Sequence, residues 1–537
     1  MTFAPTPSVG MPVRGDRVLR YVTAFCPICH DAGRDRPLPE VRRLSGYLAE
    51  ADGAVWLVRG CPDHGRVVTF YDESAEILEY LEQWTAPTKA HSPDTVGNFD
   101  PVPSVYLRGL GEMQTQHTCI LLEDITQECN LRCPTCFADS SPDLSGVVPI
   151  SEILASVDQR LERENGRLDV VMLSGGEPTL HPEFPKLLAA LGDRNIVRVL
   201  VNTNGVLLAR DDGLLETFRR NRSQVEVYLQ FDGLRKDTYL HHRNADLRSI
   251  KRRALARVSE AGVFTTLTMT ASLGVNDDEI GAVIETALAT PYVGGVTIQP
   301  VFGSGRATPI NPYDRLTHTG VLARMAPQTG GLVTWQDMTA LPCSHPHCCS
   351  VGYIVKTDSG DWRSIVSMIG HDRLKEHLGL VANRIADHEI PDELRSVVQE
   401  SLLGLLSEQT SLSHPTIGDL IRNVCESCDL GIASLLRLAG SSVGRQDKLR
   451  EVIGERIKRI TVKPFMDINT MIEERLIQCC VHVGTRSEDD RDQCAPFCAV
   501  QAWAPLGRTK LAEQAGRRAG TVPLTLRKNR TTREVLT

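Results

Sequence analysis

Extended apolar runs alternate with helix-length segments from residue 120 to about residue 325. The runs predict strands at residues 120–126, 169–173, 197–202, 225–231, 264–270 and 295–301. The segments between and after them predict helices at residues 150–164, 182–191, 213–220, 248–261, 277–289 and 312–325. Six strand–helix units in a row predict an α/β fold with a parallel sheet and right-handed crossovers. In such sheets ligands bind at the carboxyl ends of the strands.

A cysteine triplet follows the first predicted strand. Cys129, Cys133 and Cys136 have the spacing Cys-x3-Cys-x2-Cys within Glu-Cys-Asn-Leu-Arg-Cys-Pro-Thr-Cys-Phe. Zinc sites usually take their ligands as two separated pairs, whereas cysteine thiolates also hold iron–sulfur clusters. Three local thiolates on a cluster of four irons leave one iron free to bind something other than protein. The spacing therefore favours a cluster with an open iron over a zinc knuckle or a set of buried thiols.

A glycine-rich segment follows the second predicted strand. Its residues are Gly175, Gly176, Glu177 and Pro178. Two glycines let a backbone approach a ligand closely, and a carboxylate can accept a charge-assisted hydrogen bond from an ammonium group. Polar residues at later strand ends, Asn204, Gln230 and Asp232, are predicted to lie at the same edge of the sheet. The alternative for each is a turn-forming polar residue beside a glycine.

The triplet followed by Gly-Gly-Glu-Pro resembles the radical S-adenosylmethionine superfamily. The resemblance implies a partial (βα)6 TIM-like barrel, a [4Fe–4S] cluster on the triplet, and S-adenosylmethionine on the free iron. It also implies reductive cleavage of this cofactor to a 5′-deoxyadenosyl radical, with the Gly-Gly-Glu-Pro segment binding the cofactor's amino group. The implied cofactor-binding residues are Gly175, Gly176, Glu177, Pro178, Asn204, Gln230 and Asp232.

One position departs from the family pattern. The superfamily usually has an aromatic residue just before the third cysteine, near the adenine. Here that residue is Thr135, and Phe137 follows the cysteine instead. We therefore expect the adenine to pack differently or against another side chain.

Bulk composition places few limits on the chemistry. The chain has 537 residues, which predicts two to four domains, and 16 cysteines. No apolar run approaches the length of a membrane-spanning helix, and the start lacks a signal sequence, so a cytoplasmic location is expected. Cysteines in that setting favour metal and cluster ligation over disulfides. The net charge of −8 gives no general case for nucleic-acid binding.

Two knuckle-like turns lie near the amino terminus. Cys26-Pro-Ile-Cys29 and Cys61-Pro-Asp-His64 supply four ligands, which suits one tetrahedral zinc or iron. His30 or a remote cysteine could replace His64, and a thiol pair without metal is the alternative. A closed site of this kind is expected to stabilise a small domain.

Nine cysteines follow the predicted barrel. They are Cys343, Cys348, Cys349, Cys425, Cys428, Cys479, Cys480, Cys494 and Cys498. We expect one auxiliary cluster in the Cys479–Cys498 group. A second is expected to draw on Cys343, Cys348 or Cys349 together with Cys425 and Cys428, with His345 and His347 as substitute ligands or polar loop residues. Cys119, which is isolated before the first strand, is predicted to be a small core residue.

These motifs divide the chain into four parts. Residues 1–115 are expected to form a zinc- or rubredoxin-like domain, and residues 116–325 the radical core. Residues 326–505 are expected to form an auxiliary iron–sulfur domain. Residues 506–537 form a basic tail, interpreted as frayed and solvated or as a peripheral contact for anionic lipid.

The layout of residues 20–505 resembles the tetraether lipid synthases and their relatives, the archaeal pterin methylases. Besides the motifs above, it includes Lys463-Pro-Phe-Met-Asp467 and Pro496-Phe-Cys498. The leading expectation is C–C bond formation on a lipid alkyl or acyl chain after hydrogen abstraction from an unactivated C–H bond. The alternatives are C-methylation of a pterin or similar heterocycle, peptide maturation, and a non-catalytic iron–sulfur scaffold or redox sensor. An external reductant such as ferredoxin or flavodoxin is expected as a partner.

Overall fold

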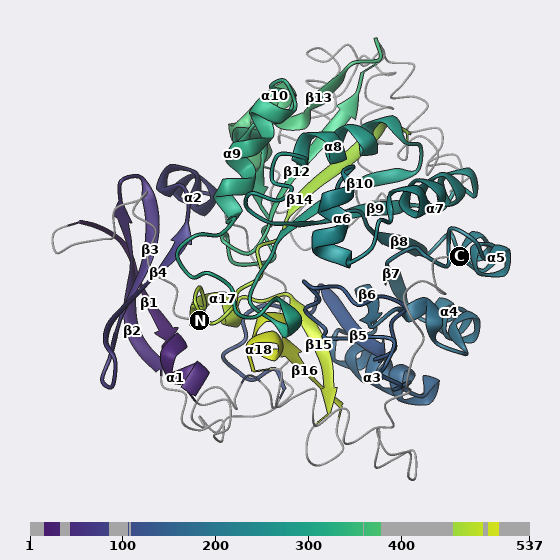
Figure 1. The fold of residues 1–537 in the computed structure, drawn as a ribbon, viewed down its shortest axis with the longest axis horizontal. Helices are drawn as coiled ribbons and strands as arrows, with labels where there is room; N and C mark the ends of the chain where they lie inside the picture. The colour runs from purple at the N-terminus through teal and green to yellow at the C-terminus, as the bar shows by residue number, and fades with distance from the viewer. Residues whose placement is uncertain are drawn as a thin grey trace, which may run out of the picture.

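The computed structural model describes residues 16–32, 43–84, 106, 109–357, 359–376, 455–486 and 492–503. Cys425, Cys428 and the basic tail, for which the sequence makes predictions, lie outside these ranges. In the described part of the chain the strands form a four-stranded sheet and a twelve-stranded sheet. Figure 1 shows the smaller sheet, in purple, beside the larger one.

The smaller sheet is antiparallel and has the strand order β1-β2-β3-β4. Its elements are β1 (Arg17–Phe25), α1 (Pro27–Ala32), β2 (Arg43–Ala51), β3 (Ala54–Cys61), β4 (Gly65–Asp72) and α2 (Ala75–Glu82). Successive side chains of a strand face opposite sides, so Trp56 and Val58 pack in one core while Val55 and Leu57 pack in another. Both faces of β3 are therefore buried.

Six parallel strands in chain order form the centre of the larger sheet. They are β5 (Ile120–Thr126), β6 (Leu168–Gly175), β7 (Ile196–Thr203), β8 (Val225–Gln230), β9 (Thr265–Ala271) and β10 (Val293–Pro300). The helices are α3 (Ile150–Arg163), α4 (Phe184–Gly192), α5 (Asp212–Arg220), α6 (Lys236–Arg243), α7 (Arg248–Glu260), α8 (Ile280–Ala289) and α9 (His318–Gln328). The predicted six-unit α/β core is confirmed.

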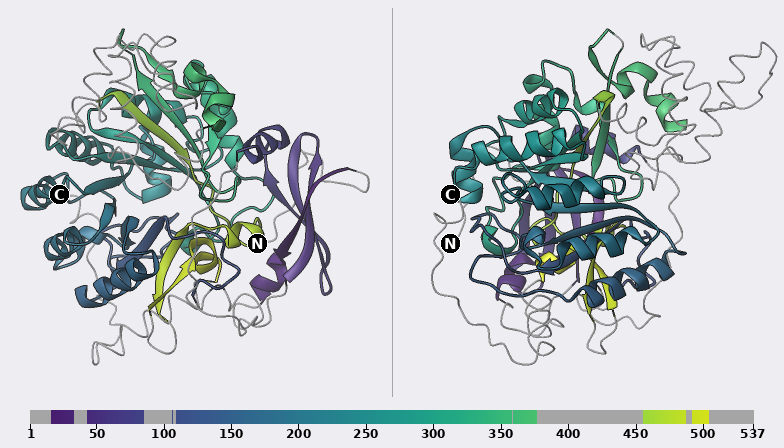
Figure 2. Two further views of the ribbon diagram at one scale, coloured as in Figure 1. Left: turned by 180° about the vertical axis from the view of Figure 1, so that it is seen from behind. Right: turned by 90° about the vertical axis from the view of Figure 1, so that its right-hand side faces the viewer.

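Successive side chains of these strands face opposite sides of the sheet and pack in two different hydrophobic cores. In β6, Val171 and Leu173 pack with helix residues such as Leu188, whereas Val170 and Met172 face the inner side. Helices α3, α4, α5 and α7 cover the outer side, and the small sheet lies across the inner side (Figures 1 and 2). The inner side is where the carboxyl-terminal segments also pack.

Segments after the core extend both edges of its sheet. β14 (Ile457–Val462) pairs in parallel with β10, and β15 (Val481–Arg486) pairs in parallel with β5. The remaining elements are β11 (Thr339–Ala340), β12 (Ser350–Lys356), β13 (Trp362–Ser364), α10 (Ile365–Ile369), α11 (His371–Glu376), α17 (Glu473–Ile477), β16 (Asp492–Pro496) and α18 (Phe497–Ala502). Residues that the sequence assigns to an auxiliary domain thus share a sheet with the core.

Helix α6 has no counterpart among the predicted helices. Its sequence, Lys-Asp-Thr-Tyr-Leu-His-His-Arg, is polar, so apolar periodicity gives it little signal. The helix ends at Asn244, which adopts the left-handed conformation with φ of 56°. It places His242 and Arg243 at the carboxyl edge of the sheet, where they meet the cysteine loop.

Candidate active site and cysteine groups

The cysteine triplet lies in the loop that follows β5. Its side chains pack with Leu131 and Tyr239 in one apolar cluster, and burial followed by the charge of Cys133 raises the pKa of Cys129. The three sulfur atoms do not all lie within 4.8 Å of one another. Ligands of a single tetrahedral metal with 2.3 Å bonds would be about 3.8 Å apart. The donor set therefore fits a polynuclear cluster better than a single zinc ion.

Gly175 and Gly176 let the end of β6 touch the chain that leads into the triplet. A Cβ on Gly176 would lie 2.1 Å from the carbonyl oxygen of Glu128, and one on Gly175 would lie 2.4 Å from that of Thr126. The N–H of Gly176 donates to Thr126 O at 2.6 Å, and the N–H of Glu177 donates to Glu128 O at 2.8 Å. The glycines are thus required by contact with the protein's own backbone.

The Glu177 carboxylate is buried and has several protein donors. It accepts hydrogen bonds from the hydroxyls of Thr179 and Thr203, both at 2.6 Å, and from the N–H of Asn204 at 2.8 Å. Burial raises its pKa, and these hydrogen bonds oppose the shift. In the structure this carboxylate ties β6 to β7, and its expected contact with the cofactor's ammonium stays a prediction. Pro178 begins the short 3-10 turn Pro178–Leu180.

Asn204, Gln230 and Asp232 come together beside the triplet. Asn204 Nδ2 donates to Asn130 Oδ1 at 2.6 Å and lies 4.0 Å from Cys129 Sγ. The side-chain oxygen Oε1 of Gln230 accepts from Arg243 Nη2 at 2.8 Å. The sequence correctly places these polar side chains at one edge of the sheet, although each also has a partner within the protein.

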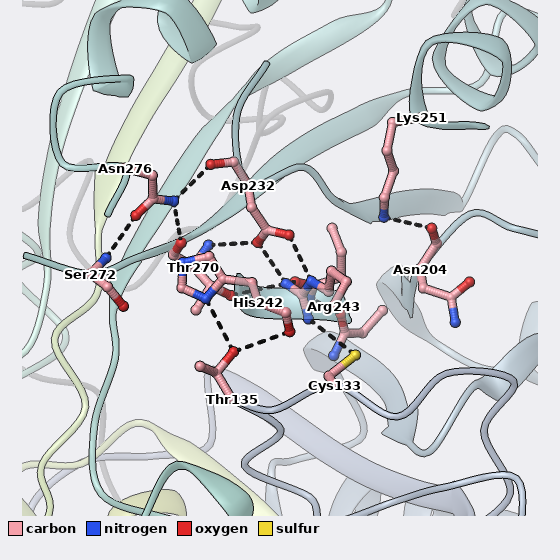
Figure 3. Close-up of polar contacts among 12 residues, drawn as sticks. Cys133, Thr135, Asn204, Asp232, His242, Arg243, Lys251, Thr270, Ser272 and Asn276 are labelled. Carbon is pink, nitrogen blue, oxygen red and sulfur yellow. Dashed lines mark hydrogen bonds and ion pairs between the residues drawn. The ribbon is translucent and has the colours of Figure 1, made fainter. Parts of the chain in front are cut away.

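Arg243 is the central residue that the sequence did not single out. Its Nε and Nη2 donate to the two Asp232 oxygens at 2.6 Å each, and its Nη1 lies 3.9 Å from Cys133 Sγ (Figure 3). Burial would raise the pKa of Asp232, but the Arg243 charge outweighs it and the pKa falls to about 2. A buried carboxylate needs a cation beside it. The predicted placement of Asp232 at this edge of the sheet was therefore the one signal in the sequence that an arginine such as Arg243 would be found there.

Lys251 is a second buried cation at this edge. Its ammonium donates to Asn204 O at 2.7 Å, and burial lowers its pKa to about 8 (Figure 3). On the other side of the loop, Thr135 Oγ1 contacts His242 Nδ1 at 3.1 Å. Phe137 turns toward the carboxyl-terminal segment, where its ring lies 5.7 Å from that of Phe497.

The four predicted amino-terminal ligands come together. The Sγ atoms of Cys26, Cys29 and Cys61 lie 3.6, 3.3 and 3.5 Å from His64 Nδ1, and all four ligand atoms lie within 4.8 Å of one another. These separations fit one tetrahedral ion. His30, the alternative ligand, instead contacts Ala502 O at 2.7 Å.

Cys119 belongs to a second close group. Its Sγ lies within 4.8 Å of those of Cys343 and Cys480, and all three residues are buried. His117 Nε2 is 3.4 Å from Cys119 Sγ. Cys119 is buried in the inner core, as predicted, but the sequence did not reveal that it lies in this thiol group. It was missed because its partners lie more than 200 residues away in the sequence.

The adjacent residues Cys479 and Cys480 face different groups. Burial, followed by the charges of Cys498 and Cys348, raises the pKa of Cys479. Cys480 instead lies in the close group with Cys119 and Cys343. Cys494 packs in the outer core instead, which differs from the expected grouping of Cys479 to Cys498. Adjacent side chains of an extended chain point in opposite directions, which explains why Cys479 and Cys480 face different groups.

Cys349 and the two histidines of the same loop contact other protein groups. The Cys349 thiol is buried and lies 3.9 Å from Ser350 O. His347 contacts Tyr71 Oη at 2.9 Å and Glu82 Oε1 at 2.8 Å, so both of its ring nitrogens have partners. His345 Nδ1 accepts from the N–H of His347 at 3.1 Å. This geometry favours the interpretation of both histidines as polar loop residues.

No helix in the described ranges combines the length and apolar character that a bilayer-spanning segment requires. The basic tail, which the sequence analysis interprets as solvated or as a lipid contact, is outside those ranges.

Family models match two parts of the chain. Residues 124–287 match the Radical SAM superfamily, and residues 18–73 match the HMPTM N-terminal zinc ribbon domain. The match covers β6 to β9 with the triplet, the Gly-Gly-Glu-Pro segment and the Asp232–Arg243 pair. The chain belongs to the radical SAM superfamily and is a radical SAM enzyme.

Individual relatives extend this comparison. The chain is 26% identical over 505 residues to a 7,8-dihydro-6-hydroxymethylpterin dimethyltransferase of Methanocaldococcus jannaschii, covering 88% of this chain and 92% of the relative. It is 32% identical over 167 residues to a GTP 3′,8-cyclase of Chlorobaculum tepidum, covering 30% and 47%. A solved radical SAM methyltransferase from Sphaerobacter thermophilus is 14% identical with a TM-score of 0.28, covering 60% of this chain and 77% of that one.

Proposed function

We propose that this enzyme is a radical C-methyltransferase that acts on a pterin or a similar reduced heterocycle. The observation that carries the proposal is the similarity to the pterin dimethyltransferase, which covers 92% of that relative. It extends beyond the radical core, and the ribbon at residues 18–73 matches a domain model of its own. The comparisons give no support to a lipid chain as substrate, the leading expectation from the sequence.

Cys129, Cys133 and Cys136 would hold the [4Fe–4S] cluster. When bound, the cluster and S-adenosylmethionine supply a carbon radical strong enough to take hydrogen from a C–H bond. The backbone contacts of Gly176 and Glu177 fix the chain that enters the cysteine loop. Burial of Asp232 and Arg243 beside Cys133 keeps this edge of the site away from water.

The other thiol groups have supporting roles in this proposal. The amino-terminal Cys3His group would hold one zinc or iron and stabilise the small sheet. Its ligands come from the start of α1 and the residue before it, and from the end of β3 and the turn that follows. Cys119, Cys343 and Cys480 are the residues to hold an auxiliary metal centre. They draw together chain segments from before β5, after β11 and before β15, so a centre there would also brace the fold.

The test is a product assay under anaerobic conditions with dithionite and S-adenosylmethionine. The substrate is 7,8-dihydro-6-hydroxymethylpterin, with a reduced folate carrying a methylene group or excess S-adenosylmethionine as the one-carbon donor. We expect 5′-deoxyadenosine together with a pterin heavier by one methylene unit. Deuterium placed on the methylated carbon should appear in deoxyadenosine.

Two comparisons make this assay decisive. Cys133→Ala should abolish both products while iron bound elsewhere is retained. A saturated-chain phospholipid in place of the pterin should give no coupled product. Substrate-dependent deoxyadenosine with lipid but not with pterin would overturn the proposed substrate. Absence of deoxyadenosine from protein with an intact, reducible cluster would favour a scaffold or redox sensor.

A further inference from the structure

The Lys463-Pro-Phe-Met-Asp467 motif lies along the carboxyl end of β10. The N–H of Lys463 donates to Ile298 O at 2.9 Å. Asp467 is buried, and its Oδ2 accepts from the N–H of Gly303 at 2.8 Å and from Arg315 Nη1 at 2.6 Å. Because a buried carboxylate with two donors has little freedom to move, the motif fixes the loop that follows β10.

The same loop contacts the radical triplet. The N–H of Arg306 donates to Cys136 O at 3.0 Å, so the loop after β10 lies against the third cysteine. The predicted cofactor-binding residues Asn204, Gln230 and Asp232 lie instead at the ends of β7 and β8. The end of β10 is thus a separate part of the carboxyl edge of the sheet, and it is close to where the radical would form.

Gln299 and Tyr228 form a polar pair at the end of β10. Gln299 faces the inner side because its neighbour Ile298 packs in the outer core, and it is partly exposed. Its Nε2 donates to Tyr228 Oη at 3.1 Å. Within the ranges that the structure describes, neither side chain forms a second hydrogen bond. Gln299 Oε1 can therefore accept a hydrogen bond from another molecule, and the Tyr228 hydroxyl can donate one.

Aromatic rings lie beside this pair. Tyr228 packs in the same apolar cluster as Phe302, and the partly exposed rings of Phe137 and Phe465 pack against that cluster. The ring centroids of Phe465 and Phe137 lie 5.4 and 6.4 Å from that of Phe302. Such rings suit the faces of a flat molecule. An acceptor and a donor side by side suit the N–H and C=O edge of a cyclic amide.

We propose that the end of β10 binds the heterocyclic substrate through its cyclic amide edge. Gln299 Oε1 accepts from the ring N–H, the Tyr228 hydroxyl donates to the C=O, and Phe137 and Phe465 contact the faces of the ring. This proposal rests on the proposed function, because it names the residues that recognise that substrate. A saturated lipid chain would leave both polar groups without a partner, so the pair also determines specificity.

The test measures binding of 7,8-dihydro-6-hydroxymethylpterin to the reconstituted enzyme by anaerobic equilibrium dialysis, without reductant. Gln299→Leu should weaken binding by about tenfold, because the acceptor is lost. Gln299→Glu keeps an acceptor oxygen and should recover part of that affinity. Gln224→Leu is the matched control. Gln224 is also partly exposed, but its Nε2 donates to Ile196 O at the amino end of the sheet, so binding should be unchanged.

Tyr228→Phe removes only the hydroxyl and tests the pair if Gln299→Leu does not fold. It should also weaken pterin binding, while binding of S-adenosylmethionine stays unchanged in every variant. Equal pterin binding by the unaltered protein and the folded variants would overturn this site but leave pterin methylation standing. Weaker binding of S-adenosylmethionine alone would overturn it in favour of an adenine site. No pterin binding by the unaltered protein would overturn the proposed function and this site together.

Discussion

Arg243 forms a two-point ion pair with Asp232, with both N–O distances at 2.6 Å, directly behind Cys133. Asp232 is fully buried and Arg243 is 8% exposed, so neither charge is screened by water. Thr270 closes the arrangement by donating its N–H to Asp232 and accepting from Arg243 at 3.1 Å. The pair joins the loop after β8, the end of α6 and the cysteine loop.

Removing either partner of this pair should be costly. Arg243→Gln and Asp232→Asn should each lower the free energy of unfolding by about 3 kcal/mol, because the other charge is left buried and unpaired. The double variant should lose less than the sum of the two. Denaturant unfolding of the three proteins measures the coupling, and additive losses would contradict it.

The same variants should affect chemistry as well as stability. Arg243→Gln should lower the rate of S-adenosylmethionine cleavage by at least about tenfold, or about 1.4 kcal/mol, since the donor beside Cys133 is lost. Arg198→Gln is the matched control. Arg198 is also buried, but it lies near the amino end of β7 with Glu226 as its ion-pair partner. Arg198→Gln should therefore cleave S-adenosylmethionine at the unaltered rate per folded enzyme.

Gly176→Ala should disrupt cluster binding. The new Cβ would stand 2.1 Å from Glu128 O, so the chain entering the triplet must shift. We expect a loss of about 1–3 kcal/mol in unfolding free energy and reduced iron at the radical site. Gly192→Ala is the control, since its Cβ would meet only Gln224 Oε1 at 3.6 Å. Iron analysis and the EPR spectrum measure cluster binding. Equal iron in both variants would contradict the requirement for close contact between Gly176 and the carbonyl of Glu128.

Sequence reasoning succeeded where the motif is local. The spacings of the triplet and the amino-terminal knuckles predict which side chains meet, because a short loop or hairpin leaves them little choice. The Gly-Gly-Glu-Pro segment was also placed correctly at the end of a strand. Gly176 also accommodates the carbonyl of Glu128, a contact that the sequence does not reveal because Glu128 belongs to the loop of a neighbouring strand.

Long-range grouping could not be predicted in the same way. Cys119, Cys343 and Cys480 meet only because β15 pairs with β5 after an excursion of more than 350 residues. The spacing of the nine carboxyl-terminal cysteines does not specify which of two adjacent residues, such as Cys479 and Cys480, faces which thiol group. Arg243 was missed for a related reason. What distinguishes it is that it is buried, and the polar sequence around a charged residue gives no sign of its burial.

Cys119→Ala should remove the metal of its group. Its Sγ lies within 4.8 Å of Cys343 and Cys480, and a two-thiol remainder binds metal weakly. Cys494→Ala loses an equally buried thiol from the outer core, so both variants carry a similar packing cost. Metal analysis of the purified proteins should show a deficit only in Cys119→Ala. The same metal content in both would mean that Cys119 is a core residue that binds no metal.

His318 should make the fold sensitive to acid. Its Nε2 contacts Ser350 Oγ at 2.9 Å between α9 and β12, and burial, aided by the charge of Arg475, lowers its pKa to about 3. The unfolded chain binds a proton near pH 6.5, whereas the folded protein does not, so stability falls as pH drops from 6.5 toward 3. The slope approaches about 1.4 kcal/mol per pH unit once the unfolded histidine is charged.

His318→Gln keeps a group that can hydrogen-bond Ser350 but cannot titrate. Its free energy of unfolding should therefore fall less steeply than that of the unaltered protein between pH 6 and about pH 4. Other buried histidines and the thiolate sites contribute equally to both proteins, so the difference between the two curves isolates His318. Denaturant unfolding at several pH values measures it. Parallel curves would mean that His318 binds its proton equally well in the folded and the unfolded protein, against the burial that separates it from water.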